Sequence, residues 1–148
     1  MKAMRVTKSS IVLKVCILLL GISGNIAHSN ETSKNGLTHF WMQFQSAVQS
    51  TNTKKIQALT TFPFELKGEM DDAPIQKYNK KKFLLLLPKL LSADSGTASK
   101  PIAMKDLILK TANVKKSENG EFQLGIFVFR NENGRWSWIR AYYESDAP

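Results

Sequence analysis

Residues able to move protons are few in this chain beyond its first 29 positions. His39 is the only histidine in that part, and Asp106 is the best conceivable partner for it. A His–Asp pair, or a carboxylate beside a tyrosine such as Tyr78 or Tyr142, can act as a general acid and base. However, His39 falls in the first turn of a predicted helix, where side chains are more often solvated than catalytic. No aspartate lies within a stretch of alternating apolar residues, where it would be buried. We therefore assign no catalytic residue.

Metal and cofactor chemistry also lack the residues they need. One histidine, no cysteine and scattered carboxylates after residue 29 do not supply the three or four converging ligands that zinc requires. The sequence contains neither a G-x-S-x-G nucleophile elbow nor a glycine-rich loop for phosphate. We expect no metal ion and no cofactor.

The first 29 residues predict export. Basic residues precede the apolar run at residues 15–22, and Ala27, His28 and Ser29 offer the small–x–small pattern of a cleavage site. The run is shorter than the roughly 20 residues that a membrane span needs, so we expect a signal peptide and no stable membrane insertion after cleavage. The expected location is the periplasm. Secretion, or tethering by an uncleaved N-terminal segment, are the alternatives.

Charge and cysteine content narrow the class of partner. The chain has 21 Lys and Arg against 12 Asp and Glu, a net charge of +9. Four of the basic residues lie in the signal segment, so 17 against 12 remain, or +5. A charge of that size is ordinary for a small soluble domain, and we expect no nucleic-acid partner. The only cysteine, Cys16, also lies in the signal segment.

Hydrophobic periodicity predicts one domain over residues 37–148, after a flexible start at residues 30–36. A helix should begin at the N-cap Thr38. Its apolar stripe consists of Phe40, Trp41, Phe44, Ala47 and Val48. A second short helix should span residues 53–60 and end before Pro63.

The middle of the chain predicts a strand pair and a third helix. The strands should lie at residues 62–68 and 75–78, and the helix should begin after the cap Asn79. Four consecutive leucines at 84–87 make this helix apolar almost all round, which predicts heavy burial, and Pro88 should kink or end it. The lysine run at residues 80–82 could bind an anion or form the solvated start of the helix.

The C-terminal part predicts three antiparallel strands, at residues 107–114, 121–130 and 135–144. Alternation places Trp136, Trp138, Arg140 and Tyr142 on one face of the last strand, and Phe127 and Phe129 share a face of its neighbour. Both alternations within residues 122–129 are apolar, so both sheet faces should be covered. Helices would cover one face and a second copy of the chain the other.

This order of elements resembles the cystatin-like α+β roll superfamily, which is named for nuclear transport factor two and includes ketosteroid isomerase and scytalone dehydratase. The residues that carry the resemblance are Phe40-Trp41-x-x-Phe44-x-x-Ala47-Val48, Phe62-Pro63-Phe64, Lys82-Phe83-Leu84 and Gly134-Arg135-Trp136. The chain looks most like small exported bacterial members without an assigned function. The resemblance implies a curved antiparallel sheet wrapped around N-terminal helices, a conical cavity, and a homodimer through the sheet face.

We expect an exported, non-enzymatic binding or protein-interaction module. A small apolar ligand would occupy the cavity, or a protein partner would bind the sheet. The alternative is a cavity enzyme of the isomerase or dehydratase type that uses tyrosines and an acid. A cavity filled by aromatic and leucine side chains would leave protein interaction as the function. The candidate cavity or interface residues are Trp41, Phe44, Tyr78, Phe127, Phe129, Trp136, Trp138 and Tyr142.

Overall fold

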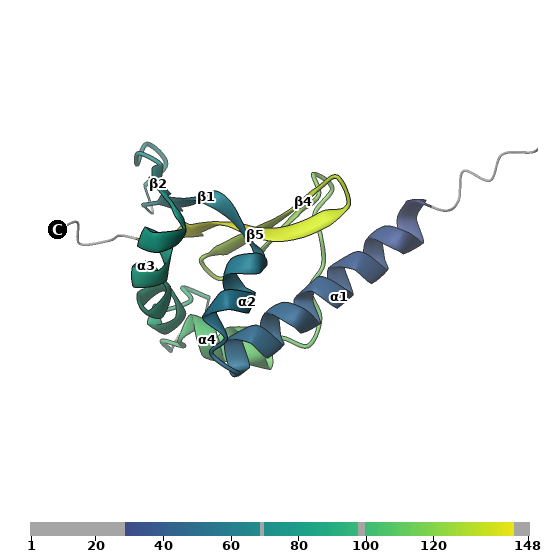
Figure 1. Ribbon diagram of the computed structural model, residues 1–148, viewed down its shortest axis with the longest axis horizontal. Coiled ribbons are helices and arrows are strands. Elements are labelled where there is room, and N and C mark those ends of the chain that lie inside the picture. The colour runs from purple at the N-terminus through teal and green to yellow at the C-terminus, as the bar shows by residue number, and fades with distance from the viewer. Residues whose placement is uncertain (1–28, 69, 98–99, 144–148) are drawn as a thin grey trace, which may run out of the picture.

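The computed structural model describes residues 29–68, 70–97 and 100–143 (Figure 1). The predicted signal peptide, apart from Ser29, lies outside these ranges. The described chain is an α+β structure in which helices precede and flank a five-stranded sheet. Its helices are α1 (Ser29–Gln49), α2 (Thr53–Ala58), α3 (Lys80–Ser92) and α4 (Met104–Lys110). Its strands are β1 (Thr60–Lys67), β2 (Gln76–Tyr78), β3 (Glu121–Leu124), β4 (Phe127–Glu132) and β5 (Arg135–Tyr142).

Helix α1 begins at Ser29, so the expected N-cap at Thr38 is wrong. The helix also covers residues 30–36, where we expected a flexible start. At Gly36 the helix comes close to β5, because a Cβ on this glycine would lie 4.0 Å from Cδ1 of Trp136. The expected apolar stripe is confirmed, since all of its residues are buried: Phe40, Trp41, Phe44, Ala47 and Val48.

The sheet is mixed and open, with strand order β2-β1-β5-β4-β3. The expectation of an antiparallel sheet is therefore wrong at one junction, where β1 and β5 run parallel. The remaining pairs, β1–β2, β3–β4 and β4–β5, are antiparallel. The first and the last strand meet at the centre of the sheet, and the chain between them supplies α3, α4 and a hairpin.

Two of the predicted C-terminal strands are wrong. The first half of the expected strand at residues 107–114 is instead the end of helix α4, and the rest is irregular. Met104 and Ile108 of this helix are buried one helical turn apart. The expected strand at residues 121–130 is a hairpin, in which β3 and β4 are joined at Gly125 with a φ of 53°. This turn explains why both alternating sets of residues within 122–129 are apolar. Leu124 and Ile126 pack against the same core as Phe122, Phe127 and Phe129.

A bulge in β5 changes which side chains share a face. Val128 pairs with Arg140 and Phe129 with Trp138, so Ile139 is an extra residue on β5. Trp136 and Trp138 belong to the core, as does Ala141, whereas Arg140 pairs with Glu65 across the opposite face. The prediction that Trp136, Trp138, Arg140 and Tyr142 lie on one face is therefore wrong beyond the bulge.

Helix α3 starts as predicted and ends later than predicted. The Lys82 amide donates to Oδ1 of the N-cap Asn79 over 3.0 Å. The helix continues through Pro88 to Ser92, so it does not end at the proline, and a kink at Pro88 stays a prediction. Leu87 and Leu90 are buried before and after the proline, and their packing holds the last turn against the core.

The four-leucine run is only half buried. Leu86 and Leu87 belong to the core, whereas Leu84 is 39% exposed and Leu85 is 76% exposed. The expectation of burial all round the helix is wrong, because α3 lies at the end of the helical layer and packs along one side (Figure 1).

All four helices lie on one side of the sheet (Figure 1). The core between these two layers is rich in aromatic rings. The opposite face of the sheet, here called the outer face, carries polar and charged side chains from the same strands. Its ion pairs are Arg130 with Glu121 and Glu132, and Arg140 with Glu65.

Replacing Gly125 by alanine should lower the free energy of unfolding by about 2–4 kcal/mol. The new Cβ would lie 2.7 Å from Sδ of Met104 and 2.9 Å from the carbonyl oxygen of Ser95, at a positive φ. Urea denaturation of both proteins measures the difference.

Gly120→Ala is the matched control. Gly120 has a φ of 77°, but a Cβ there would meet nothing within 4 Å, so only backbone strain of about 1–2 kcal/mol should result. An equal loss in the two variants would contradict the close approach of the β3–β4 turn to α4.

Candidate functional site

Most of the sequence-predicted candidates lie in the core. Trp41, Phe44, Phe127, Phe129, Trp136 and Trp138 are each at most 4% exposed. Their rings contact one another: the centroid of Phe44 lies 5.1 Å from that of Phe129, and the centroid of Phe127 lies 4.2 Å from that of Trp138. Aromatic side chains therefore occupy the helix-covered face of the sheet, where we expected a cavity.

The two candidate tyrosines are not brought together. Tyr78 pairs with Phe64 on the core side of β2, and its hydroxyl donates to Oε1 of Gln76 over 2.8 Å. Tyr142 lies at the end of β5, on the outer face. It lines the same hollow as Arg140. These tyrosines therefore lie on opposite faces of the sheet.

Arg140 anchors the polar network of the outer face. Its guanidinium donates to Glu65 through Nε and Nη2, and Tyr142 lines the hollow beside it. Burial by itself would lower the pKa of Arg140, but these hydrogen bonds and the charge of Glu65 raise the pKa above its ordinary value. A hollow of about 350 Å³ lies beside this network. Because the Arg140 guanidinium is already paired with the Glu65 carboxylate, we interpret this ion pair as structural.

The His39 and Asp106 candidates are both exposed, and no cluster of metal-binding groups forms in the part of the chain that the structure describes. His39 is exposed, and its Nε2 lies 2.8 Å from Nε2 of Gln43. Asp106 is exposed in the first turn of α4. Within the described ranges, no three His, Cys, Asp or Glu side chains cluster as metal ligands. Of the helices described, none combines the length and the apolar character needed to cross a bilayer.

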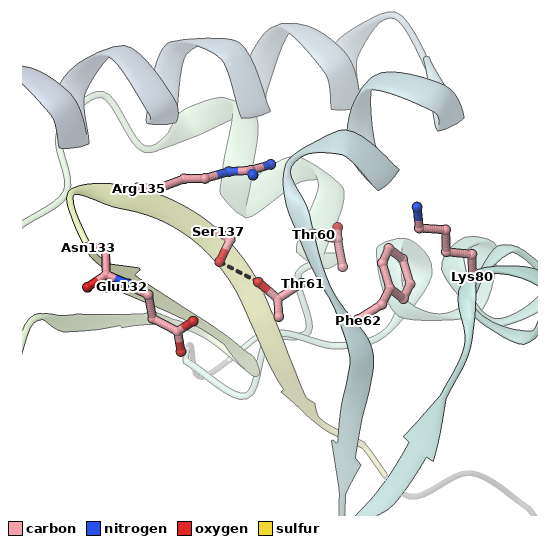
Figure 2. Close-up of a pocket in the computed structure, with 8 residues that line it drawn as sticks. All are labelled: Thr60, Thr61, Phe62, Lys80, Glu132, Asn133, Arg135 and Ser137. Atoms are coloured by element: carbon pink, nitrogen blue, oxygen red, sulfur yellow. Dashed lines mark hydrogen bonds between the residues drawn. The ribbon is translucent and has the colours of Figure 1, made fainter.

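An open cleft of about 610 Å³ lies where β1 begins, beside the β4–β5 turn and the start of α3 (Figure 2). We call it the Arg135 cleft. It is lined by Thr60, Thr61, Phe62, Lys80, Glu132, Asn133, Arg135 and Ser137. The parallel pairing of β1 with β5 brings these distant segments together, since Thr60 is the register partner of Trp138.

Two cations in the cleft are positioned by neighbouring groups. Nη2 of Arg135 donates to the carbonyl of Ala58 over 3.1 Å, at the C-terminal end of α2. Nζ of Lys80 lies 5.7 Å from the ring centroid of Phe62, which is a cation–π contact. Figure 2 shows the two cationic ends on either side of β1, both above Glu132 in the view. None of the ion pairs within the described residues uses either cation.

A pair of hydroxyls lies between the two strands that line the cleft. Oγ1 of Thr61 and Oγ of Ser137 are 2.7 Å apart, so one donates to the other and the second keeps its own proton free (Figure 2). A cleft lined by these hydroxyls and by Arg135 and Lys80 has groups that can bind a carboxylate or phosphate. Of these residues, only Lys80 was a candidate for anion binding from the sequence, as part of the lysine run at residues 80–82.

Comparison with known proteins adds no relative. No protein-family model matches the chain, and neither a curated protein nor a solved structure matches it. The cleft is therefore interpreted from its own geometry.

Trp138→Phe should destabilise the protein by about 1–2 kcal/mol more than Trp136→Phe. Nε1 of Trp138 donates to the carbonyl of Arg140 over 2.9 Å, so its loss leaves that oxygen without this donor. Nε1 of Trp136 is buried with no hydrogen-bond partner in the described part of the chain, so its removal relieves a desolvated donor. Urea denaturation compares the two variants, and an equal or larger loss for Trp136→Phe would contradict this assignment.

Proposed function

We propose that the chain is an exported, non-enzymatic interaction module whose Arg135 cleft takes an anionic group presented by a protein partner. The observation that carries the proposal is that Arg135, Lys80 and the Thr61–Ser137 hydroxyl pair all line the same open cleft. An acidic side chain or a chain-terminal carboxylate has the chemistry to bind there. The partner's remaining surface would lie against the cleft's rim.

Packing of the helix-covered face supports surface binding over an internal ligand. Phe44 and Trp138 are fully buried, and their ring centroids lie 5.7 Å apart. Leu87 and Leu90 of α3 are buried against the same cluster. A small apolar ligand would have to displace these side chains, whereas the Arg135 cleft is already open.

The charge distribution in the cleft favours anions that enter from one direction. Arg135 presents a planar fork that can bind a carboxylate through two hydrogen bonds. Lys80 adds a point charge at the neighbouring side. Glu132 lies at the opposite end and is 3.6 Å from Nη1 of Arg130, which offsets part of its charge. An anion would therefore bind toward Arg135 and Lys80.

We also infer that the fold is a roll of the cystatin-like type and that the protein works in the periplasm. The first inference is supported by the element order, with two helices, a strand pair, two further helices and a final three-stranded meander. The second rests on the N-terminal sequence pattern. A homodimer through the outer face stays a prediction, and sedimentation at micromolar concentration would detect it.

Titration of the purified full chain with an acidic hexapeptide of Asp and Glu tests the proposal. Isothermal calorimetry should detect binding, and Arg135→Gln and Lys80→Gln should each weaken it about 10-fold, because each removes a charge-assisted contact. Glu132→Gln should strengthen binding, since it removes a repelling carboxylate.

Two controls make the experiment decisive. The matched Asn and Gln hexapeptide should not bind, and Lys110→Gln, an exposed lysine on α4, should leave affinity for the acidic peptide within 2-fold. Equal affinity for the two peptides, or equal losses from Lys110→Gln and Arg135→Gln, would refute recognition of an anion by this cleft.

A further inference from the structure

The outward side of α3 combines exposed leucines with lysines. The helix reads KKKFLLLLPKLLS, with four lysines and no acidic residue. Leu85 is 76% exposed and Leu84 is 39% exposed, although both belong to the longest run of leucines in the chain. Single exposed leucines are common on protein surfaces, but an adjacent pair within a lysine-rich helix is a distinct arrangement.

Helical spacing places these residues on one surface. Lys81, Leu85 and Lys89 are successive members of an i, i+4 row, which spans about 12 Å along the axis. Leu84 and Lys82 lie beside this row, and all five residues are exposed. We call them the α3 face. The lysines of this face take part in no ion pair within the described residues.

The other side of α3 already makes all the core contacts of the helix. Phe83, Leu86, Leu87 and Leu90 are buried, and the centroid of the Phe83 ring lies 5.5 Å from that of Trp138. The exposed leucines therefore contribute little to the core. Lysines in the first turn also oppose the helix dipole, so the composition of the α3 face is unfavourable for the isolated fold.

We propose that the α3 face docks on a bilayer surface rich in anionic phospholipid. The argument is charge complementarity: lysine ammonium groups reach lipid phosphates while Leu84 and Leu85 enter the boundary between headgroups and acyl chains. The helix would lie on the surface and not cross the bilayer. This inference goes beyond the proposed function, because Lys80 of the Arg135 cleft contacts Phe62 and is not part of the α3 face.

Vesicle co-sedimentation of the full chain tests this docking. The vesicles contain equal parts phosphatidylglycerol and phosphatidylcholine, and pure phosphatidylcholine vesicles serve as the neutral comparison. Because every variant keeps the same N-terminal segment, differences between variants report on α3. We expect the triple variant Lys81→Glu, Lys82→Glu, Lys89→Glu to bind the anionic vesicles at least about 10-fold more weakly than wild type.

The control has the same change in charge at other exposed lysines. The triple variant Lys54→Glu, Lys110→Glu, Lys115→Glu should stay within about 3-fold of wild type, because these lysines lie on α2, at the end of α4 and in the segment before β3. Leu85→Ser keeps all charges and should weaken binding about 5-fold, since it removes apolar contact with the lipid. Thermal unfolding should be similar for all variants, because every substituted side chain is exposed.

Three outcomes would overturn the proposal. Equal losses in the two triple variants would show a general charge effect. Unchanged vesicle binding by the α3 triple variant would exclude this face, and would leave an acidic protein surface as its complementary partner. Unchanged binding by Leu85→Ser together with a loss in the α3 triple variant would mean that the leucine does not contact lipid, contrary to the docking described.

Discussion

Trp138 is the residue that connects the helical layer to the sheet. Its ring is fully buried and contacts Phe44 of α1, Phe64 of β1, Phe83 of α3 and both Phe127 and Phe129 of β4. Its backbone amide donates to the carbonyl of Leu59, at the junction of α2 and β1, over 2.9 Å. One side chain on the last strand thus connects elements from the beginning, middle and end of the described chain, and ring contacts of this kind contribute beyond the burial of their area.

The position of Trp138 also determines what surrounds it. The bulge at Ile139 lets Trp138 and Ala141 both face the core, which turns Arg140 outward to pair with Glu65. Between the register partners Thr60–Trp138 and Glu65–Arg140, β1 has more residues than β5. Thr61 begins that irregular stretch and its hydroxyl contacts Ser137, the residue before Trp138. The Arg135 cleft lies beside this contact.

The two proposed interaction surfaces both follow from which side chains the core leaves at the surface. Aromatic rings fill the helix-covered face, so polar chemistry is left to the rim, where Arg135 and Lys80 lie near the ends of two helices. Helix α3 supplies Lys80 to the cleft and Leu85 to its own outward side. A helix at the end of the layer can bury only one side, which leaves the other to contact a surface outside the molecule.

Sequence pattern alone was sufficient for the apolar stripe of α1, the Asn79 cap of α3 and the β4–β5 hairpin, because these depend on neighbours within a few residues. It was insufficient for α4, since a short apolar run fits a strand or a helix equally, and the burial of Met104 and Ile108 against other elements decided between them. Likewise, the close approach of Gly125 to Met104 and Ser95 is a tertiary contact that its sequence neighbours do not indicate. The Arg135 cleft required the tertiary structure most of all: its residues lie on four elements, and the parallel pairing of the first and last strands, which no local pattern encodes, places them side by side.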